Sequence, residues 1–176
     1  MAKTSQGSRN KKKGKAFERE CCDIFKAGTG LSFQRVPGSG AYLGGRNVIR
    51  ADSLSDEQVL LARGDIICPT EWNGAVVECK ARASFSFNLL FADSTTLNDW
   101  IDQCNIDYKQ TGGKFFAVIF KVARRGTYIV TIANQIDVFE RNYLAYTYDN
   151  TNYTISEFDE KWVKDHKDEI ETLCRL

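Results

Sequence analysis

The sequence predicts a mixed α/β domain in which a central mixed sheet is flanked by helices. Apolar residues at helical spacing alternate along the chain with short runs of β-branched and aromatic residues. The chain has 176 residues, of which 43% are hydrophobic, enough for one domain with a buried core. We expect a flexible basic arm over 1–13, the main domain over 14–140, and a C-terminal extension over 141–176 whose helix packs on the same domain.

The first half of the chain predicts a helix, a short strand and an insertion. A helix should begin near residue 15, because Phe17, Cys21 and Phe25 recur at helical spacing, and it should end at the glycines of 28–30. A short strand is expected over 32–36, followed by a turn. The segment 41–63 is expected to be an inserted loop with a short helix.

The second half predicts further strands and two helices. Strands are expected over 65–68, 75–80, 115–122 and 128–132, and helices over 95–110 and from about 156. The first two strands could pair as a hairpin-like unit. The phenylalanines at 85, 87 and 91 are expected to pack in the core or at a dimer interface. His166 is expected at the surface.

Composition excludes several functional classes. No apolar run approaches the roughly 20 residues of a membrane span, and no apolar stretch follows the basic N-terminus as in a secretory signal. We therefore expect a cytoplasmic protein without a membrane partner. The six cysteines form no CxxC pair and the chain has one histidine, which argues against zinc and favours reduced, buried thiols. A bound metal should therefore sit on oxygen ligands, as Mg²⁺ does, with Mn²⁺ as a substitute and no organic cofactor.

Three charged residues in or beside apolar strands carry the chemical prediction. Glu78 and Lys80 project to one side of the strand Val-Val-Glu-Cys-Lys, and Asp65 opens the preceding strand. Two carboxylates with a main-chain carbonyl, that of Cys79, would form a hard oxygen site for Mg²⁺. A metal ion beside a lysine suits phosphodiester cleavage. An isolated Asp with a later Glu-x-Lys also occurs by chance, as solvated charges on an edge strand.

Several motifs in order resemble the archaeal-type Holliday junction resolvases of the PD-(D/E)xK nuclease superfamily. Residues 13–20 (KGKAFERE) resemble the opening helix of that family, and residues 35–40 (RVPGSG) its R-x-x-G-S segment. Residues 64–67 (GDII) and 77–80 (VECK) resemble the two catalytic strands, and residues 112–121 a later helix-to-strand junction. The resemblance covers about residues 13–122.

The resemblance implies a restriction-endonuclease-like core and a homodimer that cuts four-way DNA junctions with Mg²⁺ in recombination and repair. From the compact, diverged sequence we expect a phage-encoded protein. It implies that Asp65 and Glu78 bind the metal, that Lys80 is the catalytic lysine, and that Glu18 helps, directly or through water. DNA contacts are expected from the basic N-terminus and the following turn, at Lys11, Lys12, Lys13, Lys15, Arg19, Arg35 and Ser39. The basic residues of the N-terminal arm could instead form a solubilising tail.

Two departures from the family leave other functions open. Residues 41–63 exceed the usual loop, and the tail beyond about residue 135 has no counterpart. Another PD-(D/E)xK nuclease, acting in repair, restriction or replication, is therefore the main alternative. A DNA-binding module with the nuclease fold and no catalysis is the third reading.

Overall fold

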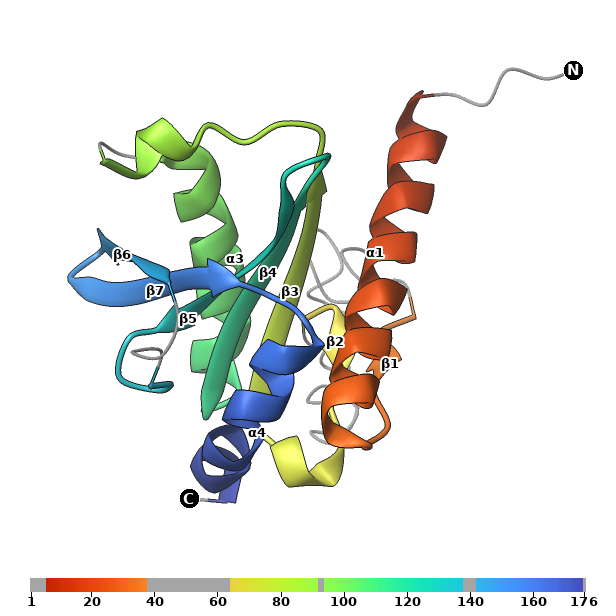
Figure 1. The fold of residues 1–176 in the computed structure, drawn as a ribbon, viewed down its shortest axis with the longest axis vertical. Coiled ribbons are helices and arrows are strands. Elements are labelled where there is room, and N and C mark those ends of the chain that lie inside the picture. Colours follow the sequence, from red (N-terminus) through yellow and green to blue (C-terminus); the bar gives the residue numbers. More distant parts are fainter. Residues whose placement is uncertain (1–5, 38–63, 92–93, 138–141, 176) are drawn as a thin grey trace, which may run out of the picture.

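The computed structural model describes residues 6–37, 64–91, 94–137 and 142–175. Its elements in chain order are α1 (Gln6–Thr29), β1 (Gln34–Arg35), β2 (Ile66–Ile67), the 3-10 helix η2 (Thr70–Trp72), β3 (Ala75–Arg82), the 3-10 helix η3 (Phe87–Phe91), α3 (Thr95–Gln110), β4 (Phe115–Val122), β5 (Gly126–Ile132), β6 (Tyr143–Tyr148), β7 (Thr151–Glu157) and α4 (Glu160–Arg175). Figure 1 shows these elements as three layers, with the sheet between helices.

The central sheet has five strands in the order β3-β4-β5-β7-β6. Only β3 and β4 run parallel, and the other neighbours are antiparallel, so the sheet is mixed. Helices α1 and α4 pack together on one face, and α3 covers β3 and β4 on the other. This arrangement confirms the predicted fold class, a mixed α/β core consistent with the restriction-endonuclease-like fold.

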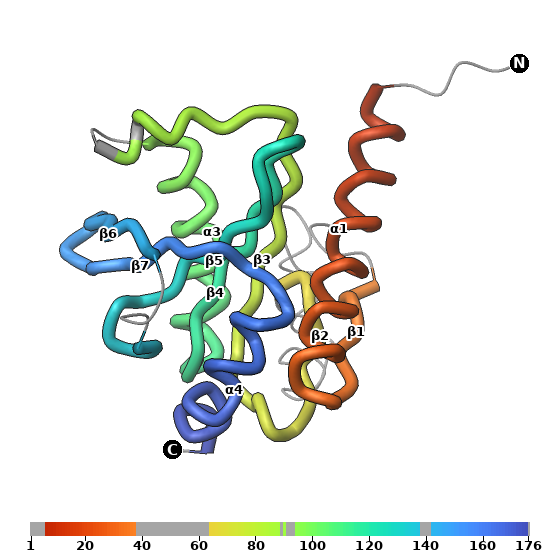
Figure 2. Tube along the Cα trace, viewed as in Figure 1, coloured from red at the N-terminus to blue at the C-terminus, as the bar shows by residue number. Residues whose placement is uncertain are grey.

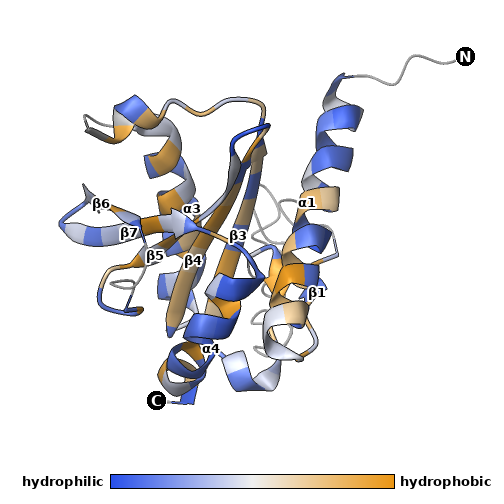
Figure 3. Ribbon diagram, viewed as in Figure 1, coloured by the Kyte–Doolittle hydropathy of each residue, from blue (hydrophilic) through white to orange (hydrophobic). Residues whose placement is uncertain are grey.

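Strand β4 lies at the centre of the core because seven of its eight residues are buried. Its alternate side chains feed two apolar clusters, one beneath α1 and α4 and one beneath α3. Figure 3 shows this apolar colouring along the central strands. A strand buried on both faces reads as a continuous hydrophobic run, which is why its bounds were predictable. None of the helices in the described ranges has the length and apolarity of a membrane span.

Helix α1 corrects the prediction of a flexible arm over 1–13. The helix already begins at Gln6, so the described part of that segment is helical. Residues 6–13 are exposed and carry no apolar stripe, the signal by which an amphipathic helix is detected. Lysine and glutamine nevertheless favour helix. The segment also extends a helix whose later turns are buried, so the free-energy cost of helix nucleation does not arise again.

Strands β2 and β3 do not form the predicted hairpin-like unit. Strand β2 forms an antiparallel pair with β1, whereas β3 pairs with β4. A single main-chain hydrogen bond, from the Asp65 N–H to the Val77 carbonyl at 2.8 Å, still joins the start of β2 to β3. The expected proximity of the two segments therefore arises without a hairpin ladder.

The C-terminal extension adds two strands that the sequence analysis did not predict. Strands β6 and β7 form a hairpin whose turn residues Asp149 and Asn150 have φ values of 46° and 56°. Ser156, the expected helix start, lies in β7, and the helix begins at Glu160. The expectation of a surface His166 was also wrong. His166 is buried, packs on the Trp162 ring and bonds Glu169 through Nδ1 at 3.1 Å.

The aromatic predictions hold where side chains are described. Phe85 packs on Trp100 and Phe120, and Phe87 packs on Tyr128, and both rings are half-buried against the cluster beneath α3. The side chain of Phe91 lies outside the described part of the structure. All six cysteines are free thiols, three of them buried and three half-buried, in agreement with the expected reduced and largely buried state.

Candidate active site

Strand β3 carries the centre of the candidate site. Its side chains alternate between the two faces of the sheet, so Val77 and Cys79 face the cluster beneath α1. Glu78 and Lys80 project to the opposite face, toward α3. Lys80 Nζ donates to Glu78 Oε1, so the two residues of the Glu-x-Lys pattern form an ion pair.

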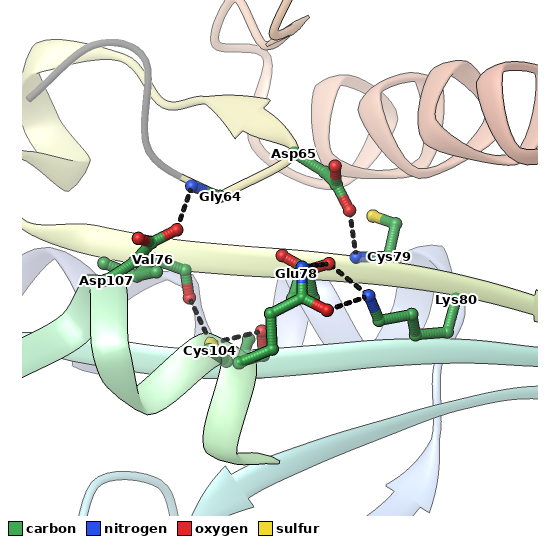
Figure 4. A network of polar contacts seen from close by, with 10 residues as sticks. Gly64, Asp65, Val76, Glu78, Cys79, Lys80, Cys104 and Asp107 are labelled. Carbon is green, nitrogen blue, oxygen red and sulfur yellow. Dashed lines mark hydrogen bonds and ion pairs between the residues drawn. The ribbon is translucent and has the colours of Figure 1, made fainter. Parts of the chain in front are cut away.

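Asp65 is held, by its backbone and its side chain, against the edge of β3 that faces away from β4. Its N–H donates to the Val77 carbonyl at 2.8 Å, and its Oδ2 accepts from the Cys79 N–H at 2.8 Å (Figure 4). Its own carbonyl accepts from the Val36 N–H at 2.9 Å, which ties in the chain beyond β1. These contacts fix the carboxylate of Asp65 beside Glu78.

The carbonyl of Cys79 faces the same edge as Asp65. In a strand, the N–H and C=O groups of one residue point toward the same side. The Cys79 N–H bonds Asp65, so its carbonyl also points away from β4 and toward the edge that Asp65 occupies. The two carboxylates and this carbonyl therefore share one edge of the sheet.

Burial and like charge perturb the ionisation of Glu78. The residue is 3% exposed and Asp65 is 7% exposed, so neither carboxylate is well hydrated. Burial, and after it the adjacent Asp65 charge, raise the pKa of Glu78 to about 8 against the opposing effect of Lys80. Two buried carboxylates that resist joint ionisation are the donor set that a divalent cation stabilises.

Gln103 on α3 is a site residue that the sequence analysis missed. Its Nε2 donates to Glu78 Oε1 at 2.9 Å, and its Oε1 accepts from Lys80 Nζ at 2.7 Å. One amide thus bridges both members of the ion pair and fixes their relative position. A lone glutamine on a helix has no local signal, because its partners lie more than twenty residues away and meet it only in the fold.

Asp107, one turn further along α3, holds the chain just before Asp65. Its Oδ2 accepts from the Gly64 N–H at 3.0 Å (Figure 4). Gly64 has a φ of +65°, and a Cβ there would lie 2.7 Å from the Val77 carbonyl oxygen. Glycine is required at this position for both reasons. Helix α3 therefore positions Asp65 through Asp107, and Glu78 and Lys80 through Gln103.

Glu18 lies on α1 and is paired with Arg35. Its Oε2 accepts from Arg35 Nε at 2.8 Å, and both side chains are largely buried. Within the described ranges, no three His, Cys, Asp or Glu side chains gather closely enough to hold a metal ion. Glu18 is therefore not placed with Asp65 and Glu78 as a third carboxylate. Because Arg35 Nε donates to Glu18, Arg35 is part of an ion pair and is not a free surface cation.

The remaining predicted residues fall in two groups. The basic residues of α1 line a hollow of about 730 Å³ on one side of the helix, at Lys11, Lys12, Lys15 and Arg19, together with Gly7 and Ser8. Lys13 is exposed and does not line that hollow. Ser39 and the whole insertion 41–63 lie outside the described residues.

Comparison with known proteins identifies the family. The model of the family described as "Phage putative PDDEXK endonuclease" matches residues 9–174, nearly the whole chain. The chain belongs to this family. Protein D14 of Escherichia phage T5 is 30% identical over 129 residues, which cover 70% of each chain. No solved structure matches the chain.

The family description agrees with the residue types at this edge of the sheet. It names the pattern PDDEXK, and the sequence has Asp65 followed by Glu78-x-Lys80, with Gly64 where the pattern has proline. The chain is thus a member of a nuclease family, and the expected relation to phage proteins agrees with the family description. The narrower resemblance to junction resolvases is not part of that description.

Proposed function

We propose that this protein is a Mg²⁺-dependent DNA endonuclease, with Mn²⁺ as a substitute ion, that hydrolyses phosphodiester bonds at the edge formed by Asp65, Glu78 and Lys80. One observation carries the proposal. Two buried carboxylates converge beside a lysine, and the pKa of Glu78 is raised to about 8 mainly by burial and then by Asp65. A divalent cation would offset this repulsion, so the residues fit the ion that the chemistry needs.

The protein groups have distinct parts in the proposed reaction. Asp65, Glu78 and the Cys79 carbonyl would hold the ion, which lowers the pKa of bound water and offsets charge on the phosphate. Lys80 would orient the attacking water and donate to a phosphate oxygen. Gln103 fixes the side chains of Lys80 and Glu78 relative to each other through its two hydrogen bonds.

Glu18 and Arg35 would act at the border of the site. Their ion pair lies on the α1 side, and Arg35 is paired with Ile66 across the β1–β2 ladder, next to Asp65. In that place Arg35 can contact the DNA backbone while Glu18 orients its guanidinium. Ser39 is proposed to lie near the scissile strand, on the strength of its place in the resolvase-like motif.

The favoured substrate is a four-way DNA junction, cut by paired nicks. The ordered motifs over residues 13–122 support it. A two-fold junction needs two active sites, which a homodimer would provide. This dimeric, junction-cutting form is the narrower part of the proposal.

A second candidate is another DNA structure or a plain duplex. It is favoured by the C-terminal extension, whose strands β7 and β6 complete the sheet beyond β5 and replace its edge with a new one. A non-catalytic role is disfavoured, because Asp, Glu and Lys of the motif are all present and mutually positioned.

One cleavage experiment separates these functions. The protein is incubated with a synthetic four-way junction, a linear duplex and a flap, each with and without Mg²⁺. Paired symmetric nicks confined to the junction support resolution, while cutting of every duplex supports the second candidate. No cleavage of any substrate with either Mg²⁺ or Mn²⁺ would refute the endonuclease proposal. Sedimentation that shows only monomer would refute the homodimer.

A further inference from the structure

Helix α1 gathers its N-terminal positive charge on one side. With 3.6 residues per turn, successive residues lie about 100° apart around the axis. Lys11, Lys12, Lys15 and Arg19 then share an arc of about 100°, as positions i, i+1, i+4 and i+8. The same four line one hollow. We call these four residues the basic ridge.

The charged residues on the other flank of α1 face away from the basic ridge. Arg9 lies about 160° around the axis from Lys11, and Lys13 lies on the side of Arg9. Further along that flank Glu20 pairs with Lys121 of β4, with distances of 2.6 and 2.8 Å to the two carboxylate oxygens. This flank therefore ends in an ion pair with the sheet, whereas the sequence has no acidic residue between Gln6 and Phe17.

The basic ridge stands on a projecting helix. Residues 6–13 are exposed throughout, and burial begins at Phe17. Figures 1 and 2 both show the first turns of α1 extending beyond the sheet and its covering helices. Like charges one turn apart repel each other and destabilise an isolated helix. A polyanion along the ridge would remove that repulsion, so the surface suits a strongly anionic partner.

We propose that the basic ridge binds the phosphate backbone of a duplex DNA arm beside the cleavage site, as a rigid helix rather than as a flexible tail. From Lys11 to Arg19 the helix rises roughly 12 Å, which matches about three to four phosphates of one strand along the duplex axis. The inference rests on the proposed nuclease function and extends it. It adds which side of α1 meets the DNA and how far the contact reaches.

The reach follows from the length of the helix. Glu18 lies beside Arg35 at the border of the candidate site, and Lys11, the first residue of the basic ridge, lies seven residues before it. At 1.5 Å per residue the ridge extends about 10 Å from that border, or about three base pairs of duplex. Substrates with duplex on this side shorter than about three base pairs should bind as weakly as the ridge variants do.

The first test compares K11A, on the basic ridge, with R9A, on the other flank. Each variant removes one positive charge. Binding of a labelled four-way junction and of a linear duplex is measured without divalent ions over a range of salt concentrations. K11A should lower the slope of log affinity against log salt by about one, and K11A/K15A by about two with an affinity loss on the order of tenfold. R9A, from the same exposed stretch, should leave the slope unchanged. Equal slopes for R9A and K11A would overturn the ridge.

The second test changes the helix and leaves every charge in place. A Cβ at Gly14 would meet nothing nearer than Glu18 Oε1 at 3.9 Å, so alanine fits there. G14A should preserve binding, while G14P should break the helix before the buried core begins and reproduce the loss seen in K11A/K15A. Equal binding by G14A and G14P would show that charge alone matters and would overturn the rigid ridge.

The outcomes separate this inference from the proposed function. Wild-type cleavage with unchanged salt slopes in all ridge variants refutes the ridge and leaves the nuclease proposal standing. Normal ridge behaviour in a protein that cuts no DNA refutes the nuclease proposal and keeps the surface. Loss of affinity for anionic phospholipid vesicles in K11A/K15A, with unchanged DNA binding, would assign the surface to a lipid and overturn the inference.

Discussion

Replacing Gln103 by alanine tests whether α3 positions the catalytic pair. The change removes the bond to Glu78 Oε1 at 2.9 Å and the bond from Lys80 Nζ at 2.7 Å. Hydrogen bonds to charged groups contribute roughly 1.5–3 kcal/mol each. Gln103 is exposed, and the Glu78–Lys80 pair survives without it, so water replaces about half of that sum. About 1.5–3 kcal/mol remains, which corresponds to a loss of roughly 10- to 100-fold in kcat.

The assay is Mg²⁺-dependent cleavage under single-turnover conditions, with the half-saturating Mg²⁺ concentration measured beside it. Q103A should lower kcat and raise the Mg²⁺ requirement, with little change in Tm. N105A is the matched control, because Asn105 lies on the same helix and bonds Tyr153 at 3.2 Å, away from the site. N105A should cleave like the wild type. A Q103A protein within twofold of the wild type in both parameters would refute the positioning role.

Three further predictions concern Glu78, Gly64 and the metal. The pKa of Glu78 is raised from 4.5 to about 8 in the folded state, so its contribution to stability is full below about pH 4.5 and is lost as the pH rises through 8. Without metal, E78Q should therefore have a higher Tm than the wild type at pH 9. A Tm difference between the two proteins that is the same at pH 5 and pH 9 would contradict this. Mg²⁺ binding should release close to one proton per site at neutral pH, measured by calorimetry in buffers of different ionisation enthalpy, and no buffer dependence would count against Glu78 as a ligand. G64A should lower the free energy of unfolding by roughly 2–4 kcal/mol, because its Cβ would lie 2.7 Å from a main-chain oxygen. G112A, at a similar φ but in open space, should lower it by about 1 kcal/mol. Equal losses for the two variants in urea denaturation would refute the steric argument.

The sequence predicted the elements whose signals are local. Helix α3 and strand β4 have the predicted bounds, because an apolar stripe and a continuous buried run each identify an element without reference to the rest of the chain. The proximity of Asp65 to Glu78 also followed, although the predicted hairpin did not form. Here a family motif supplied what periodicity could not.

Other features depend on contacts that a single sequence does not display. The hairpin of β6 and β7 was missed because its tyrosine- and threonine-rich strands were not recognised as a pair, although Asp149-Asn150 supplied a turn signal. The burial of His166 depends on packing against Trp162, and the role of Gln103 depends on two partners distant in the chain. The first turns of α1 carried no apolar stripe, so only charge was visible there.

The central claim is that Asp65 and Glu78 together support metal-dependent hydrolysis of DNA. The most direct test measures Mg²⁺-dependent cleavage and DNA affinity side by side for the wild type, D65N and E78Q. Both variants keep the size of the side chain and remove one carboxylate from a pair that shares one edge of β3. The account predicts that cleavage is abolished in both while DNA binding is retained. Full cleavage by either variant would contradict it.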